Sequence, residues 1–154
     1  MDWDEYIKWG KEAVVWGSEY RKNLRNYPVR SQNKPGETFN SIPSNPPENP
    51  ESIEQIFDDF KKIILPGVTH WQHPRFFAYF PANAAPASVF AEILTNTMGL
   101  QCMLWQTSPS ATELEEKVIE WLRISLDIPK GFGGIIQDTA SSATLTAILT
   151  MREK

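Results

Sequence analysis

The chain has 154 residues, of which 41% are hydrophobic and 22% are charged, and its formal net charge is −4. This length is sufficient for one domain with a buried core. Its basic residues are scattered, whereas nucleic-acid and anionic-membrane surfaces require clustered Lys and Arg. The composition therefore excludes these two classes of partner and predicts a soluble globular chain.

The cysteine content and the N-terminus indicate a reducing compartment. Cys102 is the only cysteine, so the chain cannot form an internal disulfide. The first ten residues, MDWDEYIKWG, lack the apolar run of a signal peptide, and no apolar run elsewhere is long enough to span a bilayer. We therefore expect a cytoplasmic protein in which Cys102 is a small buried residue, since no neighbouring base indicates a nucleophile.

The first stretch, residues 3 to about 26, predicts a long helix with a wide apolar face. Gly10 and Gly17 each cost about 1 kcal/mol of helix propensity relative to Ala, so they favour the close approach of another backbone. Trp3, Ile7 and Val14 widen the apolar surface, and we expect the helix to pack on something large; an ordinary core helix is the alternative. The predicted stripe, with alternate steps of four and three, is Tyr6, Gly10, Ala13, Gly17, Tyr20, Leu24 and Tyr27.

A proline-rich connector and a second helix follow. Residues 28–50 hold six prolines and show no periodicity, which predicts an extended connector with little regular structure. Ser52 and Gln55 have the spacing of a capping box at a helix start. The sequence Leu65-Pro66-Gly67 is expected to end this helix.

Residues 68–81, VTHWQHPRFFAYFP, contain five aromatic residues and two histidines. Pro74 and Pro81 exclude a regular helix across the segment. An irregular aromatic segment of this kind is typical of a binding-site wall, although core packing alone also explains it. His70 and His73 have no third ligand at a motif spacing, so we favour packed or substrate-adjacent histidines over a metal site.

Two further helices are expected in residues 86–128. The first runs from Pro86 to Met98 and ends at Gly99. The second begins after Ser108, a predicted N-cap with a proline at the first helical position, and ends before Pro129. Its expected buried face consists of Leu114, Val118, Trp121 and Leu122.

The last segment predicts a strand, a turn and a helix, at residues 135–137, 138–142 and 143–152. One strand with one helix cannot form a sheet, so the fold class is α/β with an incomplete sheet. The turn offers hydroxyl groups and free backbone N–H groups at a helix N-terminus, which suits a phosphate. Composition alone nevertheless favours simple helix capping by Thr139 or Ser141.

Three segments resemble one family of enzymes. LPGVTHWQHPRFFAYFP, LWQTSPSATELEEKVIEWL and GIIQDTASSATLTAILTMRE are similar to the group II pyridoxal-phosphate-dependent decarboxylases, most of all to aromatic-L-amino-acid decarboxylases. The resemblance covers essentially the whole chain in one order. It implies that residues 86–154 begin the large domain of a fold-type I PLP-dependent transferase. It also implies that residues 1–85 form an N-terminal helical segment that packs on the partner subunit of a homodimer.

The resemblance assigns roles to individual residues. The turn at residues 139–141 would bind the phosphate of pyridoxal 5'-phosphate, which reverses the preference for capping. Residues 101–105 would reach the active site of the neighbouring subunit. The implied substrate-binding residues are Trp71, Tyr79, Phe80, Pro81 and Met103, and the implied cofactor-binding residues are Thr139, Ala140 and Ser141.

The sequence also departs from the family's pattern. Met103 stands where animal dopa decarboxylases usually have phenylalanine, and Ala82 where they have a hydroxyl residue, so the preferred aromatic amino acid stays open. The turn at residues 138–142 reads Asp-Thr-Ala-Ser-Ser where many relatives have Gly-Ser-Ala-Ser-Glu. Because hydroxyl groups are kept, phosphate binding is still expected.

The Schiff-base lysine of the family is absent, so this chain holds no catalytic residue of its own. The resemblance implies the N-terminal part of an enzyme that converts an aromatic L-amino acid to its amine and CO₂ when a complementing C-terminal chain supplies the lysine. Two alternatives stay open. One is a catalytically inactive fragment or interaction-only chain, and the other is a related decarboxylase or aldehyde synthase.

Overall fold

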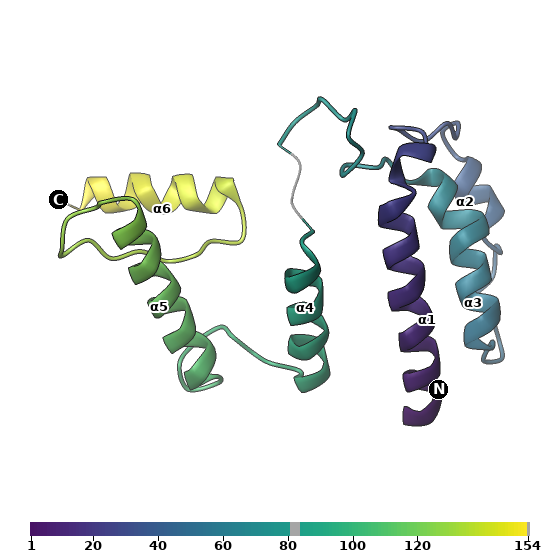
Figure 1. Cartoon of the computed structure of the whole chain (residues 1–154), viewed down its shortest axis with the longest axis horizontal. Coiled ribbons are helices and arrows are strands. Elements are labelled where there is room, and N and C mark those ends of the chain that lie inside the picture. Colours follow the sequence, from purple (N-terminus) through teal and green to yellow (C-terminus); the bar gives the residue numbers. More distant parts are fainter. Residues whose placement is uncertain (81–83, 154) are drawn as a thin grey trace. The chain divides into compact units, whose positions relative to one another are not determined.

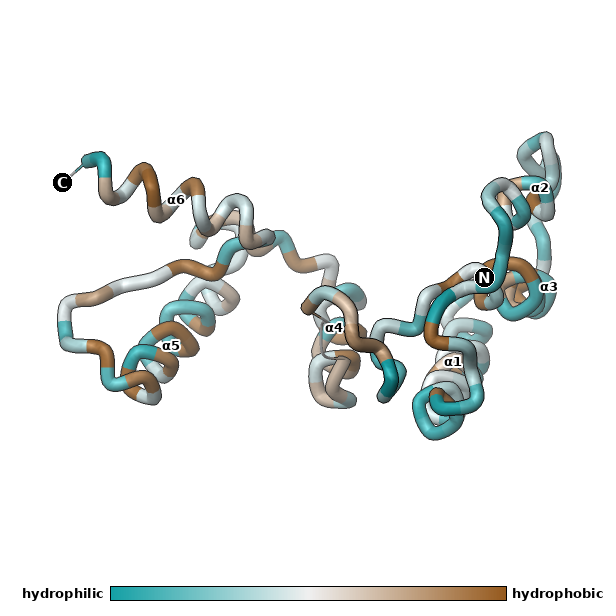
Figure 2. The backbone as a smooth tube through the Cα atoms, turned by 90° about the horizontal axis from the view of Figure 1, so that it is seen from above, coloured by the Kyte–Doolittle hydropathy of each residue, from teal (hydrophilic) through white to brown (hydrophobic). Residues whose placement is uncertain are grey.

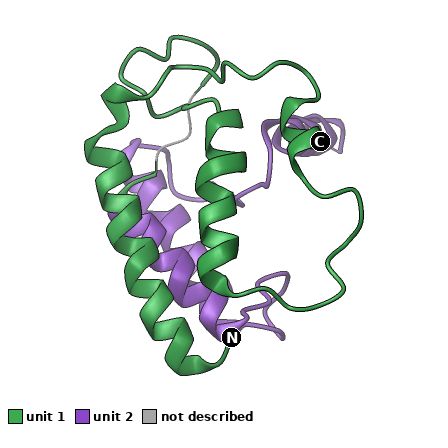
Figure 3. Cartoon of the chain, turned by 90° about the vertical axis from the view of Figure 1, so that its right-hand side faces the viewer, with its two compact units in different colours: residues 1–85 green, residues 86–154 purple. Residues whose placement is uncertain are grey.

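The computed structural model describes residues 1–80 and 84–153, which divide into two compact units, Met1–Ala85 and Pro86–Lys154 (Figure 3). The described residues contain helices and turns but no strand. The α-helices labelled in Figure 1 are α1 (Trp3–Lys22), α2 (Glu37–Ser41), α3 (Ile53–Asp59), α4 (Pro86–Met98), α5 (Pro109–Ser125) and α6 (Ala140–Arg152).

Helix α1 begins at a capping box. The Asp2 carboxylate accepts hydrogen bonds from the backbone N–H groups of Asp4 and Glu5, at 3.0 and 2.8 Å, and the Glu5 carboxylate accepts one from the Asp2 N–H at 3.3 Å. These bonds satisfy N–H groups that have no partner within the helix. Arg21 and Lys22 lie in the last turn, where positive charge suits the helix dipole.

Helix α3 begins at a capping box and continues directly into turns with a different hydrogen-bonding pattern. The predicted capping box is confirmed, because the Ser52 hydroxyl accepts a hydrogen bond from the Gln55 N–H and Gln55 reciprocates. After Asp59 the chain forms a π-helical turn, Phe60–Ile64, in which the Leu65 N–H donates to the Phe60 carbonyl. A 3₁₀ turn, Leu65–Gly67, follows and ends the helix where the sequence predicted.

Aromatic rings form the contacts between α1 and α3. The Trp16 ring lies 6.1 Å from Phe57 and 5.2 Å from Phe60, and the Trp9 ring lies 6.2 Å from Phe57. The earlier residue Trp9 contacts Phe57, whereas the later residue Trp16 also contacts Phe60, just after α3. The two helices therefore run in the same direction. A helix of twenty residues is about 30 Å long, and the long proline-rich connector carries the chain back over that length.

The predicted stripe of α1 was only partly right. Trp9 and Trp16, which the stripe omits, carry the contacts with α3, whereas Tyr6 is 37% exposed. Apart from its chain neighbours and the backbone of α1 itself, no described atom lies within 4 Å of a Cβ built on Gly10 or Gly17, so this chain does not supply the close approach expected there.

The connector is more ordered than the sequence predicted. It contains the short helix α2, which follows Gly36 in a left-handed conformation (φ 86°). The Ser31 hydroxyl donates to the Pro66 carbonyl at 3.0 Å, and the His70 N–H donates to the Val29 carbonyl at 2.9 Å. These bonds join the connector to the end of the second helical segment, which local periodicity does not reveal.

The second unit contains α4, α5 and α6, and it leaves most apolar side chains exposed. Helix α4 ends at Gly99 (φ 60°), as expected. Ser108 is the N-cap of α5 and Pro109 its first residue, as predicted, although the Ser108 side chain makes no capping hydrogen bond. The predicted buried face of α5 was wrong for Leu114, Trp121 and Leu122, which are 61%, 59% and 48% exposed, because no described element covers them. Hydrophobic positions recur along both α5 and α6 (Figure 2).

Two more expectations for the second unit were not met. Cys102 is exposed rather than buried, since it lies in a turn outside the helices. The strand expected at residues 135–137 is not formed in the described chain, because strand hydrogen bonds need a neighbouring strand. The Ile136 N–H donates instead to the Glu115 carboxylate at 2.9 Å. Among the helices that the structure describes, none is both long and apolar enough to cross a bilayer.

Candidate functional site

Three aromatic rings of the first unit stack on one another. The Trp71 ring lies 5.1 Å from that of Phe76, with 29° between their planes, and 5.6 Å from that of Tyr79, with 17° between their planes. Trp71 is 44% exposed and Tyr79 is 83% exposed. We call Trp71, Phe76 and Tyr79 the ring stack. An exposed stack of flat rings is a surface on which a further aromatic ring can pack.

The two histidines lie on either side of Trp71 in the sequence, and both are buried. His70 is 2% exposed, and its Nδ1 atom lies 2.7 Å from the Tyr20 hydroxyl. His73 is 3% exposed; its Nδ1 accepts a hydrogen bond from the Arg75 N–H at 3.0 Å. Its Nε2 atom is buried without a hydrogen-bond partner among the described residues. Both are packed histidines, as the sequence analysis favoured.

Burial sets the protonation of the Tyr20–His70 pair. It lowers the pKa of His70, with a smaller contribution from His73, so the neutral ring is favoured. Burial also raises the pKa of Tyr20, which therefore keeps its proton. Two neutral groups share the hydrogen bond, whichever of them donates.

The chain after the ring stack is exposed. Tyr79 has a left-handed backbone conformation (φ 55°), which is uncommon for an aromatic residue and costs about 1–3 kcal/mol. Phe80 is 98% exposed, so the structure brings it into no described contact with the ring stack. The predicted site residue Pro81, and Ala82 after it, lie outside the described residues.

The N-terminus of α6 holds the residues predicted to bind phosphate. Thr139 is the N-cap, and its hydroxyl accepts a hydrogen bond from the Ser142 N–H at 3.2 Å. The N–H groups of Ala140 and Ser141 come first in the helix, where no intrahelical acceptor exists. Capping and free N–H groups therefore occur together, so the turn remains suited to an anion.

Asp138 and Ser142 complete this turn, and the sequence analysis gave neither a role. The Ser142 hydroxyl donates a hydrogen bond to the Asp138 carboxylate. This bond is the main reason that the pKa of Asp138 lies below its usual range, so the carboxylate is charged at neutral pH. The pair occupies two of the three positions at which the sequence departs from the Gly-Ser-Ala-Ser-Glu pattern, the third being Thr139. That departure was the available signal.

Met103 lies in the turn between α4 and α5. It is 71% exposed. The Thr107 hydroxyl donates to the Gln101 carbonyl at 2.7 Å, and the Trp105 indole donates to the Glu113 carboxylate at 3.0 Å. These bonds shape the turn and leave Met103 free to contact another molecule.

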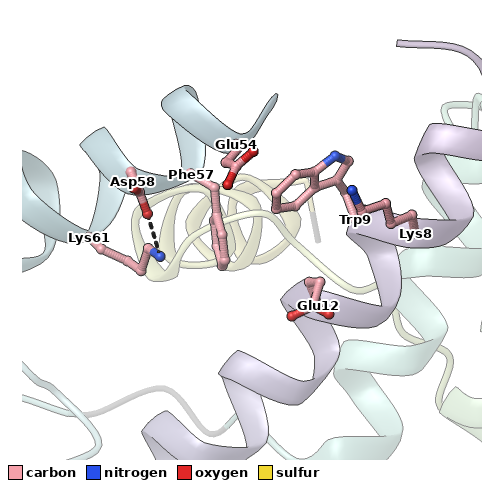
Figure 4. Close-up of a pocket in the computed structure, with 7 residues that line it drawn as sticks. All are labelled: Lys8, Trp9, Glu12, Glu54, Phe57, Asp58 and Lys61. Atoms are coloured by element: carbon pink, nitrogen blue, oxygen red, sulfur yellow. Dashed lines mark ion pairs between the residues drawn. The ribbon is translucent and has the colours of Figure 1, made fainter. Parts of the chain in front are cut away.

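A separate depression lies between α1 and α3, with a volume of about 330 Å³ (Figure 4). Trp9 and Phe57 reach into it from the two helices, and Lys61 forms an ion pair with Asp58 at 2.6 Å. Its walls mix three carboxylates with two amines and include none of the predicted site residues. Within residues 1–80 and 84–153, no three His, Cys, Asp or Glu side chains form a metal-ligand set.

Comparison with known families decides the identity of the fold. The model of the pyridoxal-dependent decarboxylase conserved domain matches residues 35–154. The chain belongs to the pyridoxal-dependent decarboxylase family. A phenylacetaldehyde synthase of Arabidopsis thaliana and a tyrosine decarboxylase of Papaver somniferum are each 39% identical to it over the whole chain, which covers 33% and 32% of their lengths.

Solved structures agree with this family membership. The tryptophan decarboxylase of Catharanthus roseus in complex with L-tryptophan superposes with a TM-score of 0.91 at 37% identity, over 99% of this chain and 34% of that one. The Oryza sativa TDC with PLP and tryptamine gives 0.90 at 29% identity, over 99% and 34%. This decarboxylase-family chain thus spans about a third of the length of the curated relatives it matches.

Proposed function

We propose that this chain forms part of a pyridoxal-phosphate-dependent decarboxylase that converts an aromatic L-amino acid to its amine and CO₂. The observation that carries the proposal is the ring stack, because the partly exposed aromatic rings of Trp71 and Tyr79 suit an aromatic side chain better than an acidic one. Phe80, Pro81 and Met103 would complete the substrate contacts. Relatives of this chain include a tryptophan decarboxylase and a tyrosine decarboxylase, which supports the substrate class.

The turn at the start of α6 would hold the cofactor, pyridoxal 5'-phosphate. Helix α6 has thirteen residues, and its N-terminus presents the N–H groups of Ala140 and Ser141 and the hydroxyls of Thr139 and Ser141. These donors and the helix dipole would bind the phosphate. When bound, the cofactor supplies the electron sink that makes loss of the carboxylate possible. Ser142 would hold the charged Asp138 carboxylate by a hydrogen bond beside this turn.

The exposed apolar surfaces support a larger assembly. In this proposal residues 86–154 begin the large domain, and the uncovered side chains of α4, α5 and α6 pack against the sheet of a fold-type I transferase. Residues 1–85 form a helical segment in which Trp3, Ile7 and Val14, exposed by 73%, 53% and 59%, pack on the partner subunit of a homodimer. A complementing C-terminal segment supplies the Schiff-base lysine, and the enzyme acts in the cytoplasm.

The test uses the purified protein that contains this chain, supplied with pyridoxal 5'-phosphate. We expect visible cofactor absorbance and the release of CO₂ and the matching amine from L-tryptophan, L-tyrosine or L-phenylalanine. L-Glutamate serves as the control and should give no product. Intact mass identifies the chains present: a lone 17.6 kDa species that neither absorbs nor turns over would contradict the catalytic proposal and favour an interaction-only chain.

A matched variant tests the role of the phosphate turn. Ser141→Ala removes one hydroxyl from the turn and should weaken cofactor retention more than substrate binding. We would measure cofactor retention by dialysis and absorbance, and substrate binding from KM at saturating cofactor. An equal loss of both would count against the phosphate role of Ser141.

An aldehyde synthase is the second candidate, because synthases of phenylacetaldehyde and 4-hydroxyphenylacetaldehyde are among the similar proteins. An aromatic substrate and the same cofactor are expected in both cases. The two activities are separated by the product, an amine in one case and an aldehyde in the other. The same reaction mixtures, analysed for both products and for oxygen uptake, distinguish them.

A further inference from the structure

One partly buried side-chain hydrogen bond joins α1 to His70, the residue that precedes the ring stack. Tyr20 and His70 are 50 residues apart, yet the Tyr20 hydroxyl lies 2.7 Å from His70 Nδ1. Tyr20 also stacks on Trp16, at 5.4 Å with 15° between the rings, and Trp16 contacts Phe57 and Phe60. The position of the Tyr20 ring, and with it the hydroxyl, is thus fixed by the aromatic contacts between α1 and the segment at residues 57–60.

The backbone around His70 is fixed as well. The His70 N–H donates to the Val29 carbonyl, and the His70 carbonyl accepts a hydrogen bond from the His73 N–H, each at 2.9 Å. The His73 carbonyl accepts from the Phe76 N–H at 2.9 Å, while its ring accepts from the Arg75 N–H. The chain therefore makes two successive turns with both histidine rings buried.

Trp71 follows His70 directly and stacks on both other rings of the ring stack. Its partners Phe76 and Tyr79 lie 5.1 and 5.6 Å away on the same turn-rich segment. Trp71 is joined to His70 by a single peptide bond, so a rotation of the His70 backbone moves the indole directly. The hydrogen bond between the His70 side chain and the Tyr20 hydroxyl opposes such a rotation.

We propose that Tyr20 and His70 are a positioning pair that fixes the substrate-facing ring of Trp71, so that α1 sets the affinity of the enzyme for its aromatic substrate. This inference rests on the proposed function. It assigns to α1 a role in substrate binding that is separate from any contact with a partner subunit. Neither residue touches the reacting atoms, and the pair acts only through Trp71.

Tyr20→Phe is the decisive variant, since it removes one hydroxyl and keeps the ring. Loss of a typical buried hydrogen bond corresponds to about a fivefold change in an equilibrium constant. In the protein that contains this chain, we expect KM for the aromatic amino acid to rise about fivefold, kcat to stay within twofold, and cofactor retention to stay unchanged. A purely structural role would lower the yield or the thermal midpoint and leave KM unchanged.

Tyr27→Phe is the matched control. The Tyr27 ring lies 4.9 Å from that of His70, but its hydroxyl makes no hydrogen bond to the described residues. This variant should leave KM unchanged. His70→Asn, which keeps a polar atom near the position of Nδ1, should raise KM less than His70→Leu, and Tyr20→Phe should add nothing in the His70→Leu background.

The outcomes separate the two proposals. The positioning pair is supported if KM increases for Tyr20→Phe but not for Tyr27→Phe, and if it increases less for His70→Asn than for His70→Leu. An unchanged KM for Tyr20→Phe, or an equal increase for Tyr27→Phe, overturns it while the proposed function stands. Wild-type protein that turns over no aromatic amino acid overturns the proposed function, and the positioning pair with it.

Discussion

In residues 1–85 the aromatic side chains of α1 and α3 meet one another, whereas in residues 86–154 the helices leave most of their apolar side chains exposed. The first unit buries Leu24, His70 and His73, while the second buries only Ser108 among its described residues. The difference shows that one unit contains a small core of its own. The other unit presents faces that are suited to contacts outside it.

The largest expected effect follows from removing the central ring of the first unit. Trp16→Ala should destabilise residues 1–85 by about 2–4 kcal/mol, because three ring contacts are lost. Trp121→Ala, whose side chain is 59% exposed, is the control and should cost less than about 0.5 kcal/mol in the 154-residue chain. Hydrogen exchange of the α1 and α5 amides measures each unit separately. Equal losses would erase the contrast between the units.

The next largest effect is expected for Gly67→Ala in the first unit, with Gly134→Ala in the second unit as the comparison. A Cβ on Gly67 would lie 2.9 Å from the Thr38 hydroxyl oxygen, which the Asn33 side chain binds, so Gly67→Ala should cost about 1–3 kcal/mol. A Cβ on Gly134 would lie 3.2 Å from a methyl group of Ile119, which can move by a few tenths of an ångström. Gly134→Ala should therefore be nearly neutral. Urea unfolding followed by circular dichroism compares the two, and a costly Gly134→Ala would reveal tighter packing in the second unit.

Two capping boxes of the same kind offer a smaller comparison. Ser52→Ala in the first unit and Thr139→Ala in the second each remove one N-cap hydroxyl, at a cost of about 1 kcal/mol to the helix. We expect Ser52→Ala to lower the unfolding midpoint of residues 1–85. Thr139→Ala should only increase hydrogen exchange at the start of α6. A global loss of stability for both variants would show that the units unfold together.

The smallest effect that we expect is a pH dependence confined to the first unit. Burial lowers the pKa of His70 below the value of about 6.5 for a free histidine, so the unfolded chain binds its proton first as the pH falls. Stability from this group is therefore complete above about pH 6.5 and decreases below it. Urea midpoints between pH 7.5 and 5 should follow this trend and lose it in His70→Asn. The same slope in that variant would assign the effect to other groups.

Local sequence rules predicted the ends of elements better than their environments. The capping box of Ser52, the stop at Leu65-Pro66-Gly67 and the end of α4 at Gly99 depend on neighbouring residues, and all three were confirmed. Burial depends on what lies across from a residue. The expectations for Cys102 and Trp121 were wrong for that reason.

The candidate site was visible in the sequence as residue types but not as a geometry. An aromatic segment and a hydroxyl-rich turn could be recognised, and the family resemblance gave them roles. The hydrogen bond between Tyr20 and His70 could not be predicted, because it joins residues 50 positions apart through the return of the connector. The pair Asp138 and Ser142 was marked only by its departure from the family pattern.

The π-helical turn at Phe60–Ile64 has a consequence for insertions and deletions in this segment. A π turn accommodates one residue more than an α turn, so it has the geometry of a single-residue insertion into a helix. Deleting Lys62 would restore α-helical bonding and rotate everything that follows by about 100° around the helix axis. Phe57 would keep its contact with Trp16, while His70 would turn away from Tyr20. The number of residues in this one turn therefore sets how the ring stack is rotated, about the helix axis, relative to the contact between Phe57 and Trp16.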